Sequence, residues 1–205
     1  LYVVATPIGN LDDISMRAAR VLRETPVVAA EDTPVARKLL NHLGASPKLL
    51  SHHEHSRKSS AAKVIEALES GDVALVTDAG TPAISDPGPL LVREAVEQGH
   101  TVIPIPGPSA LTTALSISGM AADRFAFTGF LPRKAGDREK ELTAARDRET
   151  VTVCFEAPHR VLDTLSDINR LMADREITVC REITKLYEET FRGIASEAIE
   201  QFSNP

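Results

Sequence analysis

Continuous apolar runs alternate with segments of helical periodicity along the first half of the chain. The apolar runs, which are typical of strands buried on both faces, lie at residues 1–5, 26–30, 48–51, 73–77 and 101–105. Segments whose apolar residues recur at helical spacing follow them, at residues 12–24, 35–43, 59–70, 89–98 and 106–118. Five strands alternating with five helices predict an α/β domain with a parallel sheet and flanking helices.

Local signals support this alternation. Thr33 is a candidate N-cap with Pro34 at the first helical position, and Gly44 is placed to end that helix. After Gly119 the pattern changes to strands at 124–131, 150–156 and 176–182, a helix at 159–173 and a charge-rich stretch between the first two strands. We therefore expect two α/β domains, residues 1–119 and 120–205, the second with a mixed sheet.

Composition narrows the class of protein. The 205 residues are 42% hydrophobic and 25% charged, which is typical of a globular chain that can bury a core. No apolar run approaches the ~18 residues of a membrane span and no signal peptide opens the sequence, so we expect a soluble, cytoplasmic protein without membrane contact. The net charge of −6 disfavours indiscriminate nucleic-acid binding. Cys154 and Cys180 have no CxxC spacing, so we expect reduced core thiols.

In a parallel α/β sheet, ligands bind beyond the carboxyl ends of the strands. The loops expected there are TPIGN, EDTP, HHEHS, TDAGTPAISDPG and PGPSA. The longest, residues 77–88, contains neither lysine nor arginine and lacks a P-loop signature, and no GxGxxG follows the first strand. Small residues that let the backbone approach a ligand, with Asp78 for ribose hydroxyls or a cation, suit a nucleoside without an exposed polyphosphate. The alternative is that Gly80 and Pro82 only shape a turn and Asp86 only caps the next helix.

An ordered set of motifs covers nearly the whole chain: LYVVATPIGNLDDIS, AAEDT, HEH, ALVTDAGTPAISDPG, PIPGPSALTTALS, FTGFLPRK, FEAPHR and REITKLYEE. Together they resemble the bacterial ribosomal RNA small subunit methyltransferase I family of the tetrapyrrole methylase superfamily. The resemblance implies two α/β domains, S-adenosylmethionine held between them, a homodimer, and 2'-O-methylation of a cytidine of 16S rRNA in the small ribosomal subunit.

The resemblance also implies the cofactor-binding residues. They lie mainly in the loop at residues 78–84 and in the PGPSA segment. The candidates are Pro7, Asp78, Ala79, Gly80, Thr81, Pro82, Ile84, Pro106, Gly107, Ser109, Ala110 and Phe155. The chain differs from the family at Pro34, where arginine is usual, and at Ala157, where serine is common. It begins without methionine and stops before the family's final strand, so we expect trimmed ends.

A ribose 2'-hydroxyl is a poor nucleophile when neutral, so a base or a cationic neighbour would help methyl transfer. The catalytic candidates are Glu31, Asp32, Glu54 and Glu156, with Arg160 and Lys185 as cationic partners. Each has a plainer alternative, since Asp32 could cap a helix, HEH could be a solvated loop and Glu156 could end a strand. His53 and His55 have no third ligand in the sequence, so we expect no metal.

The charge-rich stretch between residues 132 and 149 offers cations for RNA phosphates: Arg133, Lys134, Arg138, Lys140, Arg146 and Arg148. The alternative is a solvated amphipathic helix with interleaved acids. The expected substrate-binding residues are Asn10, His53, His55, Arg133, Lys134, Arg160 and Lys185. Two other functions remain open: a tetrapyrrole methyltransferase of the same superfamily, and a non-catalytic RNA-binding α/β protein.

Overall fold

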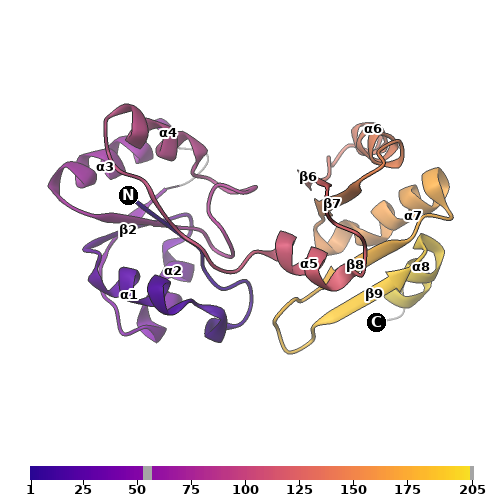
Figure 1. Cartoon of the computed structure of the whole chain (residues 1–205), viewed down its shortest axis with the longest axis horizontal. Helices are drawn as coiled ribbons and strands as arrows, with labels where there is room; N and C mark the ends of the chain where they lie inside the picture. The colour runs from indigo at the N-terminus through magenta and orange to yellow at the C-terminus, as the bar shows by residue number, and fades with distance from the viewer. Residues whose placement is uncertain (53–56, 204–205) are drawn as a thin grey trace. The chain divides into compact units, whose positions relative to one another are not determined.

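The computed structural model describes residues 1–52 and 57–203 of the chain. It consists of two compact units, Leu1–Ala110 and Leu111–Pro205, each described below by itself (Figure 1). The boundary expected from the sequence, between residues 119 and 120, groups the helix at 110–118 with the first domain. The division by contacts groups nearly all of that helix with the second unit.

The first unit has one five-stranded parallel sheet, in the order β3-β2-β4-β1-β5. The strands, in chain order, are β1 (Tyr2–Val4), β2 (Val27–Ala30), β3 (Lys48–Ser51), β4 (Val73–Val76) and β5 (Ile103–Ile105). Its helices are η1 (Leu11–Asp13), α1 (Met16–Glu24), α2 (Thr33–His42), α3 (Arg57–Ser70) and α4 (Pro89–Glu97). The next helix, α5 (Ala110–Ser118), begins at the boundary and lies almost wholly in the second unit. The predicted parallel α/β alternation is confirmed.

Helices cover both faces of this sheet, which explains why its strands are apolar throughout. Successive strand residues point to opposite faces. Val28 and Val76 pack into one core with side chains of α1 and α2, whereas Ala29 and Leu75 pack into a second core with side chains of α3 and α4. The strands β2 and β4 are thus buried on both faces by the two helical layers, whereas Lys48 and Ser51 at the ends of the edge strand β3 are exposed.

The start of α2 corrects one local prediction. Asp32, not Thr33, is the N-cap, because its backbone is extended and its Oδ1 accepts the Val35 N–H at 3.2 Å. Thr33 is already the first helical residue, which places Pro34 in the first turn. Gly44 follows the C-terminus of α2 at φ +67°, as predicted.

The second unit contains two separate strand pairs. β6 (Phe125–Phe130) and β7 (Val151–Phe155) are parallel, whereas β8 (Ile177–Arg181) and β9 (Glu189–Gly193) are antiparallel. Its helices after α5 are α6 (Ala135–Arg146), η3 (Pro158–Arg160), α7 (Val161–Met172) and α8 (Ala195–Ser203). The expected mixture of strand directions is present, divided between two small sheets.

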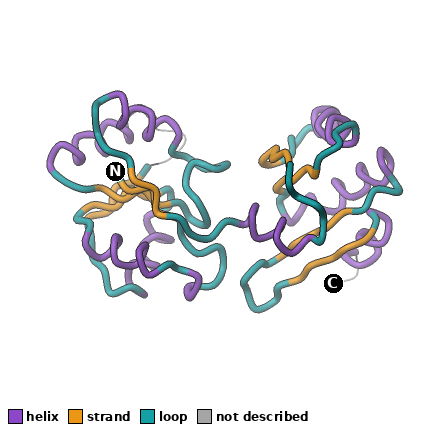
Figure 2. Tube along the Cα trace, viewed as in Figure 1, coloured by secondary structure: helices purple, strands orange, loops and turns teal. Residues whose placement is uncertain are grey.

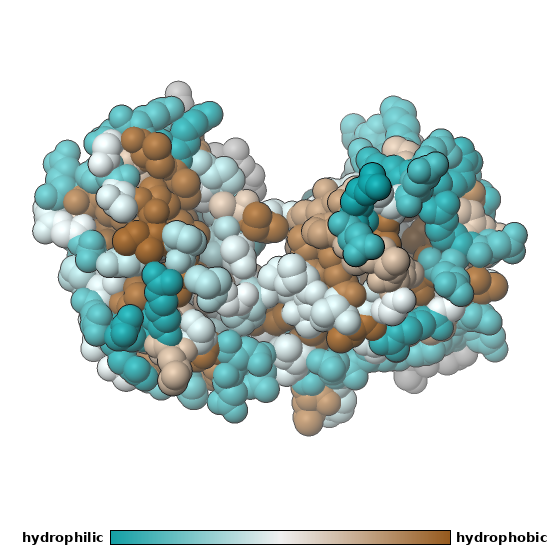
Figure 3. All heavy atoms as spheres, in the orientation of Figure 1, coloured by the Kyte–Doolittle hydropathy of each residue, from teal (hydrophilic) through white to brown (hydrophobic). Residues whose placement is uncertain are grey.

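Helix α6 is the charge-rich stretch, and hydrophilic side chains cover it in the view of Figure 3. Its buried residues are Leu142 and Arg138, and the Arg138 Nε donates to Asp167 on α7 at 2.8 Å. This ion pair joins α6 to α7. Cys154 and Cys180 are free, and burial raises the pKa of the Cys154 thiol to about 11, which agrees with a packed, unreactive thiol.

Candidate functional site

The loops that leave the carboxyl ends of β1 and β4 are joined directly, because these strands are neighbours in the sheet. Thr6 N–H donates to Gly80 O at 2.9 Å, and Gly80 N–H donates to Thr6 O at 3.1 Å. The buried Thr6 hydroxyl also donates to Thr77 O at 3.1 Å. These bonds fix the TPIGN loop against the DAGTP loop.

The loop after β5 completes this arrangement. Thr81 Oγ1 donates to Pro108 O at 3.2 Å. Gly107 lies so close to β1 that an added Cβ would be 3.1 Å from the Ala5 Cβ, which is tighter than most real contacts. Three loops that are distant in sequence therefore form one assembly, and it contains Gly80, Thr81 and Gly107 of the predicted cofactor set. Figure 2 shows these long loops in teal at the sheet of the first unit.

The loop between β4 and α4 contains strained backbone, as does the connection between β8 and β9 at Glu182 and Thr184. Ala83 and Ser85 have φ of +70° and +59°, and Gly80 and Gly88 have φ of +91° and +142°. Left-handed backbone at non-glycine residues costs free energy and is often found at ligand sites. The strain at Ala83 and Ser85 could not be predicted from the sequence, because neither residue type favours that conformation. Between them, Ile84 exposes 44% of its surface.

Carboxylates gather around Thr77 at the end of β4. The Thr77 hydroxyl donates to Glu31 Oε2 at 3.3 Å, and the Asp32 N–H donates to Asp78 Oδ1 at 3.1 Å. Burial raises the pKa of Asp86, a hydrogen bond from Thr77 lowers it in part, and the charge of Asp78 raises it further. This edge of the sheet thus carries negative charge, and its loops at 5–10, 77–88 and 106–109 contain no lysine or arginine.

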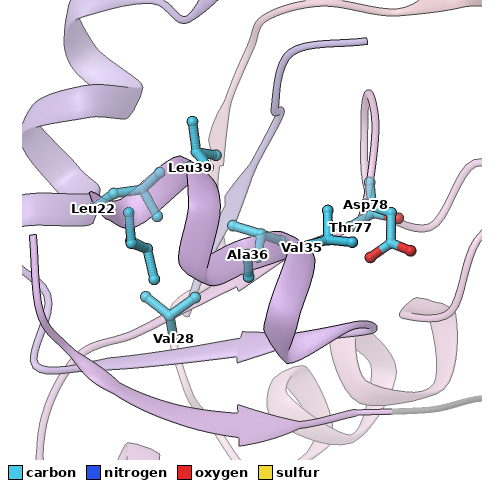
Figure 4. A pocket seen from close by; sticks show the side chains of 9 residues that line it. Leu22, Val28, Val35, Ala36, Leu39, Thr77 and Asp78 are labelled. Atoms are coloured by element: carbon cyan, nitrogen blue, oxygen red, sulfur yellow. The ribbon is translucent and has the colours of Figure 1, made fainter. Parts of the chain in front are cut away.

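A small pocket of about 20 Å³ lies beside this group, under α2. Its wall is mostly apolar, from Leu22, Val28 and Leu39, and Figure 4 shows Asp78 and Thr77 near Val35 at its polar end. The volume is enough for about one water molecule. A volume of this size is too small for a nucleoside.

Two predicted residues of the first unit have structural partners. Asp32 caps α2, which is the alternative raised for it. Asn10 is the N-cap of η1, where its Oδ1 accepts the Asp12 N–H at 3.1 Å. The substrate-binding role of Asn10 and the catalytic role of Asp32 stay predictions. His53, Glu54 and His55 lie outside the described residues.

In the second unit, Phe155 at the end of β7 packs edge-on against Phe127 and Phe130, with ring centroids 5.0 and 5.5 Å apart. Glu156, the next residue, forms an ion pair with Arg160. Lys185 is paired with Glu182 at 3.1 Å. The cofactor role of Phe155 and the substrate role of Lys185 remain predictions.

The basic residues of the charge-rich stretch separate into two groups. Arg138 is buried against Asp167, while Lys140 pairs with Asp137 at 3.3 Å and Arg146 with Asp147 at 2.8 Å. Arg133 and Lys134 are exposed and form no ion pair within the part of the chain that the structure describes. Helix α6 is therefore largely the self-neutralised helix raised as the alternative. Among the described residues of this stretch, the cations without an ion pair flank the helix, Arg133 and Lys134 before it and Arg148 after it.

Over residues 1–52 and 57–203, no three His, Cys, Asp or Glu side chains form a group suited to a metal ion. Among the same residues, no helix has the length and apolar character needed to cross a membrane. The expectation of no metal stays a prediction, because the HEH segment is not described.

The profile of the family Tetrapyrrole (Corrin/Porphyrin) Methylases matches residues 1–199. The chain belongs to this family, and it is accordingly a methyltransferase whose methyl donor is S-adenosylmethionine. Its similarity to curated relatives is more specific. It is 47% identical over 200 residues to the "Ribosomal RNA small subunit methyltransferase I" of Halalkalibacterium halodurans, which covers 97% of this chain and 69% of that protein.

Two further relatives carry the same name. The Bacillus subtilis protein is 46% identical over 200 residues, covering 97% of this chain and 68% of its own length. The Thermotoga maritima protein is 46% identical over 203 residues, covering 98% of this chain and 91% of that protein. The resemblance seen in the ordered motifs is thus confirmed over nearly the whole chain.

Solved structures confirm the fold type at low sequence identity. Diphthine synthase aligns with a TM-score of 0.75 at 15% identity, covering 97% of this chain and 83% of its own. Cobalt precorrin-4 methyltransferase aligns with a TM-score of 0.73, also at 15% identity, covering 98% of this chain and 88% of its own. The predicted tetrapyrrole methylase fold is therefore correct.

The residues of the first unit fit S-adenosylmethionine on chemical grounds. The cofactor carries a sulfonium and an ammonium group, and the sheet edge offers the carboxylates of Glu31, Asp78 and Asp86 without a lysine or arginine in the adjoining loops. Gly80 and Gly107 keep the backbone accessible where a side chain would meet Ile8 or Ala5. Asp78, Gly80, Thr81 and Gly107 are the residues best placed to hold it.

Proposed function

We propose that this protein methylates the 2'-oxygen of a cytidine in 16S rRNA, acting on the small ribosomal subunit in the cytoplasm as a homodimer. The observation that carries the proposal is the 44–48% identity, over nearly the whole chain, to proteins named ribosomal RNA small subunit methyltransferase I. The joined loops around Gly80 supply a nucleoside-binding site without a phosphate cradle, which supports the choice of cofactor.

Residues of the first unit bind the cofactor, and residues of the second unit bind RNA. S-adenosylmethionine supplies an electrophilic methyl group on a sulfonium. In the first unit, Asp78 and Asp86 balance a positive charge, and the bridge between Thr6 and Gly80 holds the loop backbone in one position. Such fixed positioning accounts for much of the rate in a displacement with a good leaving group.

In the second unit, Arg133 and Lys134 offer unneutralised charge for RNA phosphates. The remaining step is activation of the ribose hydroxyl. Glu31, which accepts a hydrogen bond from Thr77, adjoins the loops assigned to the cofactor and is the described carboxylate that we favour as the base. Asp32 and Glu156 are less suited, since one caps a helix and the other is paired with Arg160.

The test is to incubate the full-length protein with labelled S-adenosylmethionine and small subunits from a strain that lacks the modification. The expected result is one methylated 2'-oxygen, on a cytidine, mapped by primer extension and mass spectrometry. Methyl transfer to a base, or transfer to a tetrapyrrole with none to the subunit, would overturn the proposal. Binding of the cofactor without any transfer to rRNA would do the same.

A further inference from the structure

Arg160 and Glu156 form an enclosed ion pair at the end of β7. Their side chains expose only 13% and 10% of their surface. Glu156 Oε1 also accepts the Ala157 N–H at 2.7 Å, and its Oε2 accepts the hydroxyl of the buried Thr164 at 2.6 Å. The carboxylate is held by donors on three sides, which leaves it little capacity to accept a substrate proton.

The guanidinium has a second acceptor. Arg160 Nη2 donates to the backbone carbonyl of Leu131 at 3.1 Å. The N–H of Leu131 donates in turn to Phe155 O at 3.2 Å, and the Leu131 side chain is 4% exposed. Both backbone groups of this buried residue are thus bonded to β7 and to the turn that follows it.

Leu131 is the residue from which the basic segment departs. Pro132 follows it, and proline restricts its own φ to about −65°. Arg133 and Lys134 come next, and Lys134 is the N-cap of α6 with an extended backbone. Only a short and stiff piece of chain therefore separates the fixed carbonyl of Leu131 from the two exposed cations.

We propose that Arg160, held in place by Glu156, is a positioning residue that fixes the Leu131 backbone and thereby directs Arg133 and Lys134 toward RNA phosphates. This inference rests on the proposed function, and it replaces two predicted roles. Arg160 acts on the substrate through its neighbours instead of contacting it, and Glu156 holds the guanidinium instead of serving as a base. The enclosure of both side chains favours this reading over direct contact with a polyanion.

The first test is a mutant cycle on the binding of full-length protein to unmodified small subunits. Arg160→Met is expected to weaken binding about tenfold, as is usual for groups that act through one another. In the background of Arg133→Gln/Lys134→Gln the same substitution should have no further effect. Arg170→Met removes one exposed cation from the same unit without touching Leu131, and it should change binding little. Additive losses across the cycle would overturn the inference.

Glu156→Gln separates positioning from direct contact. If Arg160 touched RNA, removing the adjacent negative charge would leave binding unchanged or strengthen it. If Arg160 is a positioning residue, Glu156→Gln weakens binding as Arg160→Met does, while the affinity for S-adenosylmethionine stays at the wild-type value. Stronger RNA binding by Glu156→Gln sinks the proposal. Glu156→Gln/Arg160→Gln removes both charges together, so the same weakening can be sought if a single variant folds poorly.

Amide hydrogen exchange in the free protein makes the outcome independent of the RNA substrate. Arg160→Met should speed exchange at the Leu131 amide, whose N–H is protected by its hydrogen bond to Phe155 O, whereas Arg170→Met should not. Unchanged exchange at the Leu131 amide overturns the positioning role even if RNA binding falls. A wild-type protein that binds no subunit, yet shows the faster exchange in Arg160→Met, contradicts the proposed function and leaves the positioning contact standing.

Discussion

Thr6 and Gly80 bind each other through both backbone groups, with N–H···O distances of 2.9 and 3.1 Å. Gly80 achieves this with φ of +91°, a conformation that an L side chain rarely adopts. A Cβ at this position would lie 3.4 Å from Ile8 Cγ2 and 3.8 Å from Pro108 O, atoms of the other two loops. Glycine therefore fits this position for two reasons: it adopts the positive φ, and it leaves room for the atoms of the other two loops.

Replacing Gly80 by alanine should weaken S-adenosylmethionine binding at least tenfold and destabilise the first unit by about 1 kcal/mol, the usual cost of left-handed backbone. Gly44→Ala is the matched control, since Gly44 has φ of +67° and nothing within 4 Å of an added Cβ. It should cost similar stability and leave cofactor affinity intact. Calorimetric titration and thermal melts of both variants check this. Equal affinities in the two variants would return the DAGTP loop to a purely structural role.

Asp86 should make the stability of the first unit depend on pH. Burial raises its pKa above the ordinary value of 3.8, so the folded state binds the proton more tightly than the unfolded state. Its favourable contribution is complete below pH 3.8 and is lost as pH rises through the folded pKa. Asp86→Asn, which cannot ionise, should therefore melt above wild type at pH 7, and the difference should shrink toward pH 3.

The control for Asp86→Asn is Asp13→Asn, an exposed carboxylate of η1. Its melting temperature should follow wild type across the same pH series. A difference in melting temperature between Asp86→Asn and wild type that is constant from pH 3 to pH 7 would contradict this. It would show that ionisation of Asp86 does not destabilise the folded state.

Charge reversal at Arg133 and Lys134 should reduce RNA binding by electrostatics alone. Arg133→Glu/Lys134→Glu should weaken subunit binding. The slope of log affinity against log salt concentration should fall in magnitude by about 2, one for each lost phosphate contact. Lys140→Glu/Arg146→Glu makes the same change in charge on α6, at cations already paired with Asp137 and Asp147. We expect this control to have a much smaller effect, and neither double variant to alter cofactor affinity.

Filter binding from low to high salt measures both slopes. If the two double variants lose affinity equally, the segment before α6 has no special role. The RNA contact would then have to be sought near His53, His55 and Arg57.

The ion pair between Arg138 and Asp167 should contribute strongly to the stability of the second unit. Asp167→Asn leaves the buried Arg138 guanidinium without its carboxylate, a loss of about 3 kcal/mol. Lys140→Ala, which breaks an exposed pair, should cost about 0.5 kcal/mol or less. Urea denaturation followed by circular dichroism measures the free energy of unfolding of both variants. Similar losses would show that the buried ion pair stabilises the fold no more than the exposed one.

The same pair predicts acid sensitivity of the second unit. Desolvation raises the pKa of Asp167, but hydrogen bonds from Arg138 and Arg170 outweigh it and lower the pKa overall. A carboxylate with a lowered pKa stabilises the fold above its ordinary value of 3.8, and this contribution is lost as pH falls through the folded pKa. The gap in stability between wild type and Asp167→Asn should therefore narrow below pH 3.8.

The first unit could be predicted from sequence because its signals are local and agree with one another. Apolar runs, helical spacing and the position of Gly44 all indicate the same elements. The misplaced cap shows the limit of such signals, since Asp32 and Thr33 are both good N-caps and the extended backbone of Asp32 decides between them. The alternative in which Asp86 only caps the next helix does not hold, because the N-cap of α4 is Gly88 and no side chain caps this helix.

The second unit was harder to predict because its contacts are not local. The charge-rich stretch did not show that Arg138 is buried, since its partner Asp167 lies 29 residues away. The closing helix α8 was missed altogether. In the candidate site, too, local features could be predicted and non-local ones could not. Its loops could be named from the sequence, but the backbone bonds between Thr6 and Gly80 depend on β1 and β4 being neighbours in the sheet.

The position of β1 in its sheet has a consequence for synthesis on the ribosome. Its neighbours are β4 and β5, and the hydroxyl of Thr6 reaches a carbonyl 74 residues further along the chain. During synthesis β1 therefore cannot pair with β4 until residues near 76 have left the exit tunnel, nor with β5 until residues near 105 have left it. Nascent chains shorter than this should engage chaperones through β1 and should not retain the methyl donor. β1 is thus paired long after its own synthesis, and the three joined loops are complete only once β5 is in place.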